Sequence, residues 1–313
     1  MRAAQLKAVL PRELLASVVV FLVALPLCMG IAIASGMPPA KGLITGIIGG
    51  LVVGWLAGSP LQVSGPAAGL AVLVFELVRQ HGMMMLGPIL LLAGFLQLVA
   101  GRLRLGCWFR VTAPAVVYGM LAGIGVLIVL SQIHVMLDGT PKPSGLDNLA
   151  GFPAAVAQAI PSLGWQAGLL GLLTMLVMYL WDKLRPQTLR FVPGALLGVG
   201  LTTVISLLLA LQVKRVEVPE NLADAIDWLR PSDLLNLADP QLLIAAFAVA
   251  FIASAETLLS AAAVDRMHSG QRSDFDKELS AQGVGNMLCG LVGALPMTGV
   301  IVRSSANVQA GAT

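Results

Sequence analysis

Residues 247–307 decide how this chain folds, and they read FAVAFIASAETLLSAAAVDRMHSGQRSDFDKELSAQGVGNMLCGLVGALPMTGVIVRSSAN. An apolar run long enough to cross a bilayer carries one carboxylate, Glu256. Arg303 lies downstream, in a short half-polar segment that follows Pro296 and Gly299. An isolated charge at the centre of a membrane helix costs about 2.5–3.5 kcal/mol on insertion scales. We therefore expect both side chains to face protein or water, and an ionisable residue at that depth indicates a functional site.

A second interrupted segment lies far upstream, at residues 64–69, which read SGPAAG. The apolar segment that follows covers about residues 66–78, and it is too short to span a bilayer, which needs about 20 residues. We predict a half-helix that begins near the membrane midplane and directs its N-terminal N–H groups at an anion. Two segments interrupted by glycine and proline in corresponding positions are typical of a transporter's midplane binding site.

The composition predicts an all-helical protein with many membrane segments. Of its 313 residues, 57% are hydrophobic and 11% are charged, whereas an average soluble domain has about 25% charged residues. The net charge of +3 gives no indication of nucleic-acid binding. The three cysteines (Cys28, Cys107 and Cys289) form no CxxC or Cys/His cluster, which argues against a metal site or a disulfide. The sequence contains no phosphate-binding loop and no set of nucleophile, base and acid, so we expect neither a cofactor nor an enzyme.

Apolar runs predict ten membrane segments. Pro26 is expected to kink or break the first, residues 214–239 have room for a short amphipathic helix, and residues 274–278 are expected in a solvated loop. The predicted segments lie at about 14–35, 42–57, 66–78, 84–100, 114–137, 167–181, 193–213, 241–264, 281–295 and from 298 onward.

The lysines and arginines predict the orientation. With a cytoplasmic N-terminus, the cytoplasmic segments carry twelve of them and the opposite segments carry six, as the positive-inside rule requires. The short segments at 66–78 and 298 onward are seven segments apart, and an odd number inverts the topology. The two half-helices are therefore expected to enter from opposite sides and to meet with their N-termini at the midplane.

Several stretches together resemble the SulP (sulfate permease) family of inorganic-anion transporters. The resemblance runs from Leu10 to the end of the chain, and it rests on the order and spacing of the stretches. They are ALPL at 24–27, ASG at 34–36, VSGP at 63–66, AETLLSA at 255–261, ELSAQGVGN at 278–286 and PMTGVIVR at 296–303.

The resemblance implies a 7+7 inverted-repeat fold, also found in uracil transporters, in which a core domain moves against a gate domain. Residues 1–137 would hold core helices 1–4 and the start of the gate, with helix 5 at about 114–137. Residues 138–239 would hold gate helices 6 and 7 and an extracellular loop, and residues 240–313 would hold core helices 8–10. Segments 11–14 and a cytoplasmic STAS domain are expected to lie outside this chain, which would then be a fragment or a truncated form that does not transport alone.

The resemblance also implies roles for individual residues. Glu256 matches an acidic position linked to cation or proton coupling, and Ser260 lies one turn further on. Arg303 matches a basic residue near the anion, and the alternative is a purely structural pairing of Arg303 with Glu256 or with helix ends. The resemblance includes a cyanobacterial bicarbonate carrier that uses threonines where this chain has Ala67 and Ile301. These two differences argue against Na+ coupling and bicarbonate, and they favour a proton-linked or uncoupled carrier. The expected anion-site residues are Leu27, Ile31, Gly65, Pro66, Ala67, Gly299, Val300, Ile301 and Arg303.

The function that these residues imply is secondary active transport of a small inorganic anion, sulfate-like, across the inner (plasma) membrane by an elevator mechanism. Burial favours the uncharged form of a carboxylic acid, so Glu256 is a candidate for proton coupling. The alternatives are a bicarbonate or dicarboxylate carrier, an uncoupled anion channel, and a fragment that does not transport. The lipid bilayer and a second copy in a homodimer are the expected partners.

Overall fold

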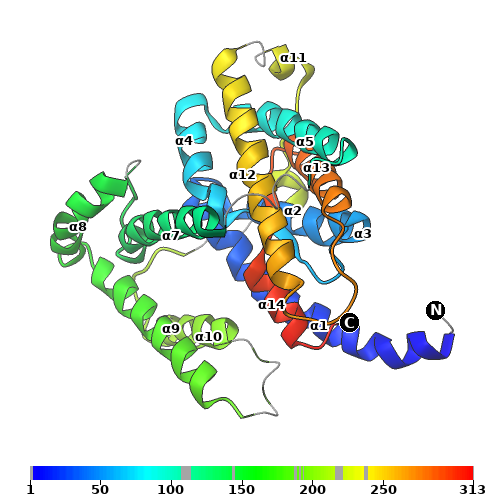
Figure 1. Cartoon of the computed structure of the whole chain (residues 1–313). Helices are drawn as coiled ribbons and strands as arrows, with labels where there is room; N and C mark the ends of the chain where they lie inside the picture. The colour runs from blue at the N-terminus through cyan, green and yellow to red at the C-terminus, as the bar shows by residue number, and fades with distance from the viewer. Residues whose placement is uncertain are drawn as a thin grey trace. The chain divides into compact units, whose positions relative to one another are not determined.

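The computed structural model describes residues 3–106, 114–142, 145–186, 189, 192, 194–215, 221–235 and 239–312 (Figure 1). They fall into two compact units. The first combines Met1–Ala122 with Val218–Thr313, and the second is Gly123–Glu217.

In the first unit, helices from both ends of the chain pack together: α5 lies along α13, and α14 lies beside α1 (Figure 1). The longer elements are α1 (Ala3–Ala34), α2 (Pro39–Ile48), α4 (Ala71–His81), α5 (Leu86–Arg102), α12 (Pro240–Val264), α13 (Phe275–Leu291), α14 (Ile301–Gln309) and the first part of α7 (Pro114–Met136). The short elements are the π-helical turn η1 (Gly49–Val53), α3 (Gly54–Leu56), the 3-10 turns η2 (Ala68–Leu70), η3 (Met83–Met85) and η5 (Leu222–Ala225), and α11 (Pro231–Leu234).

Two three-residue strands form the centre of this unit. β1 (Ser64–Pro66) pairs antiparallel with β2 (Met297–Gly299), and Gly65 lies opposite Thr298, 233 positions later. If each residue of β1 is replaced by the residue 233 positions later, and each residue of β2 by the residue 233 positions earlier, the two strands change places. The same residue pairs result. The same shift relates the bond from Ala67 N–H to Pro296 O (3.1 Å) to the bond from Val300 N–H to Val63 O (2.9 Å). The strand pair is therefore locally two-fold symmetric, as an inverted repeat requires.

The second unit contains the rest of α7, α8 (Gly145–Ala159), α9 (Gly164–Leu184) and α10 (Gly194–Leu208). Helix α9 packs on α10, where Gly198 lets α10 approach Thr174 and the hydroxyls of Thr174 and Thr202 are 3.0 Å apart. Small residues of this kind allow two membrane helices to approach closely.

Five helical stretches in the described residues are long and apolar enough to span a membrane. They are Leu10–Ala34, Pro39–Leu56, Met83–Arg102, Gly164–Leu184 and Pro240–Val264.

Several details differ from the sequence-based predictions. Helix α1 continues through Pro26, and the predicted second segment contains the π-helical turn η1. The loop expected at residues 274–278 was wrong, because the Asp274 carboxylate accepts hydrogen bonds from Asp276 N–H and Lys277 N–H and starts α13. Helix α8 was not predicted, and the two breaks, correctly located, are paired strands. Cys107 lies outside the described residues.

Candidate functional site

Each of the paired strands β1 and β2 leads into a short helix, and the two helices begin at the strand pair. Residue Ala67 leads from β1 into η2 and α4, and Val300 leads from β2 into α14. The first turn of any helix leaves N–H groups without an intrahelical acceptor, and these groups together carry about half a positive charge. The pairing of β1 with β2 therefore brings two partly positive helix starts together in the interior of the first unit. We call this place, where the strands pair and the two short helices begin, the crossing.

Arg303 adds a full positive charge at this crossing. It lies in the first turn of α14 and is 1% exposed, yet its Nε and Nη2 atoms have no hydrogen-bond partner among the described residues. Its guanidinium lies against Gly65, where any side chain would collide with it, and beside the thiol of Cys28. A buried cation without a counter-charge is costly, so the arrangement favours a bound anion.

Glu256 approaches the same crossing from α12. Its Oε1 accepts a 3.4 Å bond from the Gly69 N–H in η2, and the hydroxyl of Thr298 lies near the carboxyl group. Its Oε2 atom is buried and has no partner in the described part of the chain. The described residues contain no ion pair between Glu256 and Arg303, so the structure does not support the alternative in which they form a structural pair.

The residue after Glu256, Thr257, holds β2 in place. Thr257 Oγ1 accepts a 3.2 Å bond from the N–H of Gly299, and the carbonyl of Thr257 accepts a 3.1 Å bond from Gln62 Nε2. A side chain at Gly299 would collide with the Gln62 amide and would displace it from its bond to the Thr257 carbonyl. Ser260, one turn beyond Glu256, is buried.

Helix α13 holds β2 from the other side. The Asn286 side chain accepts a 2.8 Å bond from Met297 N–H and donates a 3.1 Å bond to Met297 O, so it pairs with β2 as a further strand would. It also donates to Gln97 Oε1 at 2.8 Å, and Gln97 donates to Ser254 Oγ at 3.2 Å. These buried amides were not singled out from the sequence, where only their position in apolar runs would have marked them.

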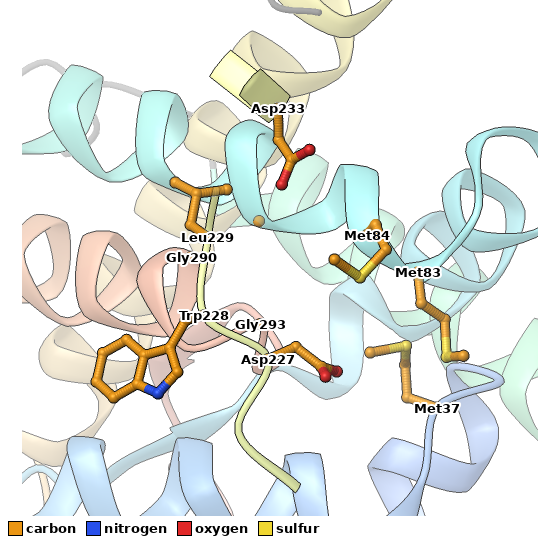
Figure 2. A pocket seen from close by; sticks show the side chains of 10 residues that line it. Met37, Met83, Met84, Asp227, Trp228, Leu229, Asp233, Gly290 and Gly293 are labelled. Atoms are coloured by element: carbon orange, nitrogen blue, oxygen red, sulfur yellow. The ribbon is translucent and has the colours of Figure 1, made fainter. Parts of the chain in front are cut away.

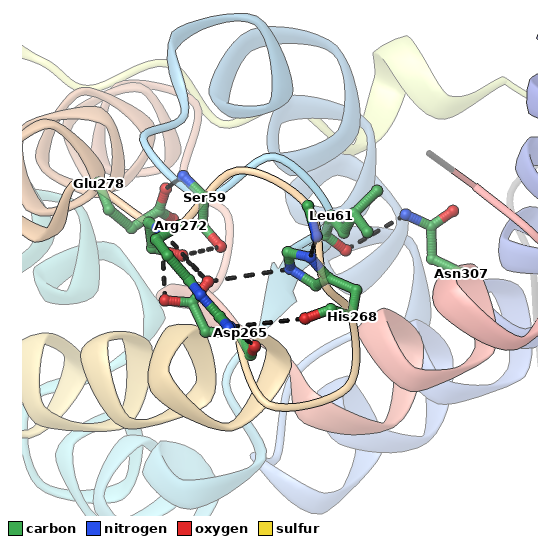
Figure 3. Close-up of polar contacts among 9 residues, drawn as sticks. Ser59, Leu61, Asp265, His268, Arg272, Glu278 and Asn307 are labelled. Atoms are coloured by element: carbon green, nitrogen blue, oxygen red, sulfur yellow. Dashed lines mark hydrogen bonds and ion pairs between the residues drawn. The ribbon is translucent and has the colours of Figure 1, made fainter.

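A second buried carboxylate fixes the chain before β1. Glu278 Oε2 accepts bonds from Gly58 N–H (2.9 Å) and Ser59 N–H (3.0 Å), and Figure 3 shows Glu278 beside Ser59. Gln282 donates to both Glu278 (3.0 Å) and the hydroxyl of Ser64 (2.5 Å). Glu278 is fully buried with these partners, so it positions β1.

The predicted site residues meet at the crossing in different ways. Gly65, Pro66, Ala67 and Gly299 are buried in or next to the strands, and Val300 and Ile301 are half-buried where α14 begins. Leu27 and Ile31 are half-buried on α1, which packs against β1 and α14. Cys28 is the α1 residue found beside Arg303, and it was not among the predicted site residues.

Two other features lie apart from this crossing. A pocket of about 10 Å³ is lined by Met37, Asp227 and Trp228 and by none of the crossing residues (Figure 2). The described residues contain no group of three or more histidine, cysteine or acidic side chains arranged to hold a metal ion. Neither feature offers a rival site.

Comparisons with known proteins identify relatives of the whole chain. The family model described as the sulfate permease family matches residues 10–313. A putative sulfate transporter of Bacillus subtilis, YvdB, is 30% identical over 96% of this chain and 56% of its own length. The bicarbonate transporter BicA of Synechocystis is 26% identical over 86% of this chain and 48% of its own.

Solved structures share the fold. The transmembrane domain of a cyanobacterial bicarbonate transporter, BicA, matches with a TM-score of 0.84 at 26% identity, over 97% of this chain and 77% of that domain. SLC26A9 matches with a TM-score of 0.79 at 16% identity, over 98% of this chain and 52% of its own. The fold is the inverted-repeat fold of these transmembrane domains, and the chain spans about half the length of the curated relatives it matches.

Proposed function

This chain belongs to the sulfate permease family, and on that premise we propose that it forms the anion-binding part of a membrane carrier for a small inorganic oxyanion. Sulfate is the favoured substrate, because the family is described by it and a 30% identical relative is named a putative sulfate transporter. Bicarbonate is the second candidate, because relatives at 26% and 23% identity are named bicarbonate transporters.

The observation that carries the proposal is the buried, incompletely paired Arg303 between two helix starts. A guanidinium presents planar N–H donors that match the oxygens of an oxyanion, and helix N-termini bind anions through backbone N–H groups. Such a site recognises charge and size more than detailed shape. Gly65, Pro66, Ala67, Gly299, Val300 and Ile301 would supply the backbone around the anion, with Leu27 and Ile31 on its α1 side.

Glu256 would couple proton and anion. Its carboxylate lies at the start of the first short helix and accepts from Gly69 N–H, a position that suits an anion. A bound oxyanion would repel the ionised carboxylate, which favours protonation of Glu256 when the anion is present. Anion and proton would therefore travel together, with Ser260 near the coupling site. Ala67 and Ile301 lack the hydroxyls that would contribute to a sodium site at these positions, so Na+ is the weaker candidate.

The remaining parts of the proposal concern movement and orientation. We assign residues 1–137 and 240–313 mainly to the core, with helix 5 starting the gate, and residues 138–239 to the gate. The mechanism that we propose is an elevator-like movement of the core against the gate. The excess of lysine and arginine on the N-terminal side supports a cytoplasmic N-terminus in the inner membrane, and a homodimer is the expected assembly.

The proposal is tested by anion binding and uptake measured in parallel. The detergent-purified chain is titrated with sulfate and with bicarbonate. Proteoliposomes that hold the chain joined to the part of the Bacillus subtilis relative that follows the matched region are assayed for uptake of each anion, with and without pH and sodium gradients. We expect saturable sulfate binding, and uptake that a proton gradient stimulates. Absence of saturable binding for both anions would exclude the proposed site. Uptake that never saturates and carries uncoupled current would identify an anion channel instead.

A further inference from the structure

A large pocket lies where two candidate membrane spans end. It has a volume of about 650 Å³, within the range of about 300–1,000 Å³ that is usual for ligand pockets. The ends of α3 and α5 flank the start of α13 there (Figure 1). Leu56 and Arg102 line the pocket, and they are the last residues of the spans Pro39–Leu56 and Met83–Arg102. The pocket is therefore at the level of the membrane–water interface, apart from the crossing.

The lining of this pocket is partly apolar and partly charged. Its apolar wall includes Leu56, Leu98 and Val284, and its cations are Arg102, Arg104 and Lys277. A ligand that fits such a lining has an apolar part and a negatively charged part.

Two acidic side chains in the lining are already held by backbone groups. Asp274 accepts the N–H groups of Asp276 and Lys277, and Asp276 Oδ1 accepts a 2.9 Å bond from Gly106 N–H. The described residues contain no ion pair between either carboxylate and Arg102 or Lys277. With three cations and two carboxylates, the pocket keeps an excess of positive charge.

Arg104 occupies a position where the backbone favours glycine. Helix α5 ends in a Schellman turn, in which Leu105 N–H donates to Ala100 O (2.9 Å) and Arg104 N–H donates to Gly101 O (3.1 Å). The turn holds Arg104 at φ 59°, a left-handed conformation that is costly for a residue with a side chain. An arginine retained at such a place points to a function of its guanidinium.

Lys277 also opposes a local preference. It lies in the first turn of α13, where the helix dipole favours acidic side chains and disfavours cations. The neighbouring carboxylate of Glu278 does not require it, because two backbone N–H groups and Gln282 already donate to that carboxylate. The dipole accounts for cations at the end of α5 but not for Lys277, so this lysine indicates a negatively charged ligand in the pocket.

We propose that this pocket binds an anionic phospholipid of the bilayer. The lipid phosphate lies at Arg102, Arg104 and Lys277, and an acyl chain lies along the apolar wall. The location favours a lipid over a soluble anion, because the headgroup and the chains of a lipid meet at the level where the two spans end. This inference rests on the pocket and not on the anion site at the crossing.

The test measures lipid binding by native mass spectrometry. The detergent-purified chain is titrated with phosphatidylglycerol, which is anionic, and with phosphatidylcholine, which is zwitterionic. We expect phosphatidylglycerol to bind about tenfold more tightly, and Arg104→Gly and Lys277→Gln each to weaken its binding about fivefold. Arg266→Gln is the control, because Arg266 is exposed in the loop before α13 and does not line the pocket, and it should leave the affinity unchanged. Equal affinity for the two lipids, or equal effects of all three substitutions, would overturn the proposal.

The unfolding temperature in detergent separates a lipid site from a structural role. Arg104→Gly and Lys277→Gln each remove a locally unfavourable feature, so without lipid the unfolding temperature should stay the same or rise. Added phosphatidylglycerol should then stabilise both variants less than the unmodified chain. A loss of stability without lipid would make these cations structural instead.

Two further arms distinguish other occupants of the pocket. Soluble glycerol phosphate that binds as tightly as phosphatidylglycerol would make it a site for free phosphate esters. The chain joined to the part of the Bacillus subtilis relative that follows the matched region should still bind phosphatidylglycerol. Loss of lipid binding in the joined protein would assign the pocket to a protein segment and overturn the proposal.

Discussion

The two halves of the crossing, one from each repeat, share one geometry and differ in chemistry. The shift of 233 positions that exchanges β1 and β2 places Glu256, Ser260, Asn286 and Arg303 opposite Val23, Leu27, Val53 and Leu70. Val53, Leu70 and Asn286 are fully buried, and Arg303 is almost fully buried. The first repeat therefore supplies a helix start and apolar packing, whereas the second supplies the charges. An inverted repeat fixes where an anion can lie, and substitutions in one half decide what binds.

Removing the Asn286 side chain should have the largest effect on stability. Asn286→Ala removes the hydrogen-bond partner of three buried groups, which are the N–H and the carbonyl of Met297 and the side-chain oxygen Oε1 of Gln97. Each buried polar group left unpaired costs about 1–3 kcal/mol, so we expect a total of about 3 kcal/mol or more. The apparent unfolding temperature in detergent measures it.

The first-repeat counterpart provides the control. Val53→Ala removes two methyl groups from a buried site and leaves no polar group unpaired, so it should cost less, about 1–3 kcal/mol. If Val53→Ala lowers the unfolding temperature as much as Asn286→Ala does, the hydrogen bonds from Asn286 to Met297 contribute no more to stability than apolar packing does.

Arg303 should decide anion affinity. A hydrogen bond to a charged group contributes about 1.5–3 kcal/mol, so Arg303→Ala should weaken sulfate binding about 10- to 100-fold. Arg303→Lys keeps the charge and should recover part of the loss. Leu70→Ala, at the equivalent position, and Arg79→Ala, which removes an exposed partner of Glu76, should leave affinity nearly unchanged. Equal affinity in Arg303→Ala would reduce this arginine to a structural role.

Glu256 should decide the pH dependence of uptake. In the unmodified protein a single coupling site allows uptake to rise with external acidity by no more than about tenfold per pH unit. Glu256→Gln fixes an uncharged side chain at this place, so uptake should become independent of pH while the folded protein is retained. Val23→Ala, on the other side of the comparison, should keep the pH dependence. An unchanged pH profile in Glu256→Gln would remove this carboxyl group as the proton site.

The sequence predicts the positions of the two interruptions and of two charged residues, the buried Arg303 and the half-buried Glu256, because glycine, proline and ionisable residues are conspicuous in apolar runs. It does not predict that the interruptions pair as strands, since three-residue strands have no alternation to detect. The ties from Asn286 and Gln282 to the strands also depend on tertiary contacts across many residues. Helix α13 begins earlier than predicted because the exposed Asp274 caps it and because Glu278, at the end of the polar run at 274–278, is fully buried.

The smallest effect should come from the helix starts that precede the two strands. Asp274 is exposed and accepts hydrogen bonds of 3.1 Å from Asp276 N–H and Lys277 N–H, so it caps α13. The equivalent position near the start of α2 is Lys41, a buried cation paired with Asp227 at 2.6 Å, and α2 has no side-chain cap. Asp274→Ala should therefore lower stability by about 1 kcal/mol, and Asp274→Asn, which caps equally well, should change it by only a few tenths. Equal losses in the two variants would mean that the charge near the helix dipole matters more than the cap, and the two repeats would then differ in electrostatics here as well as at the crossing.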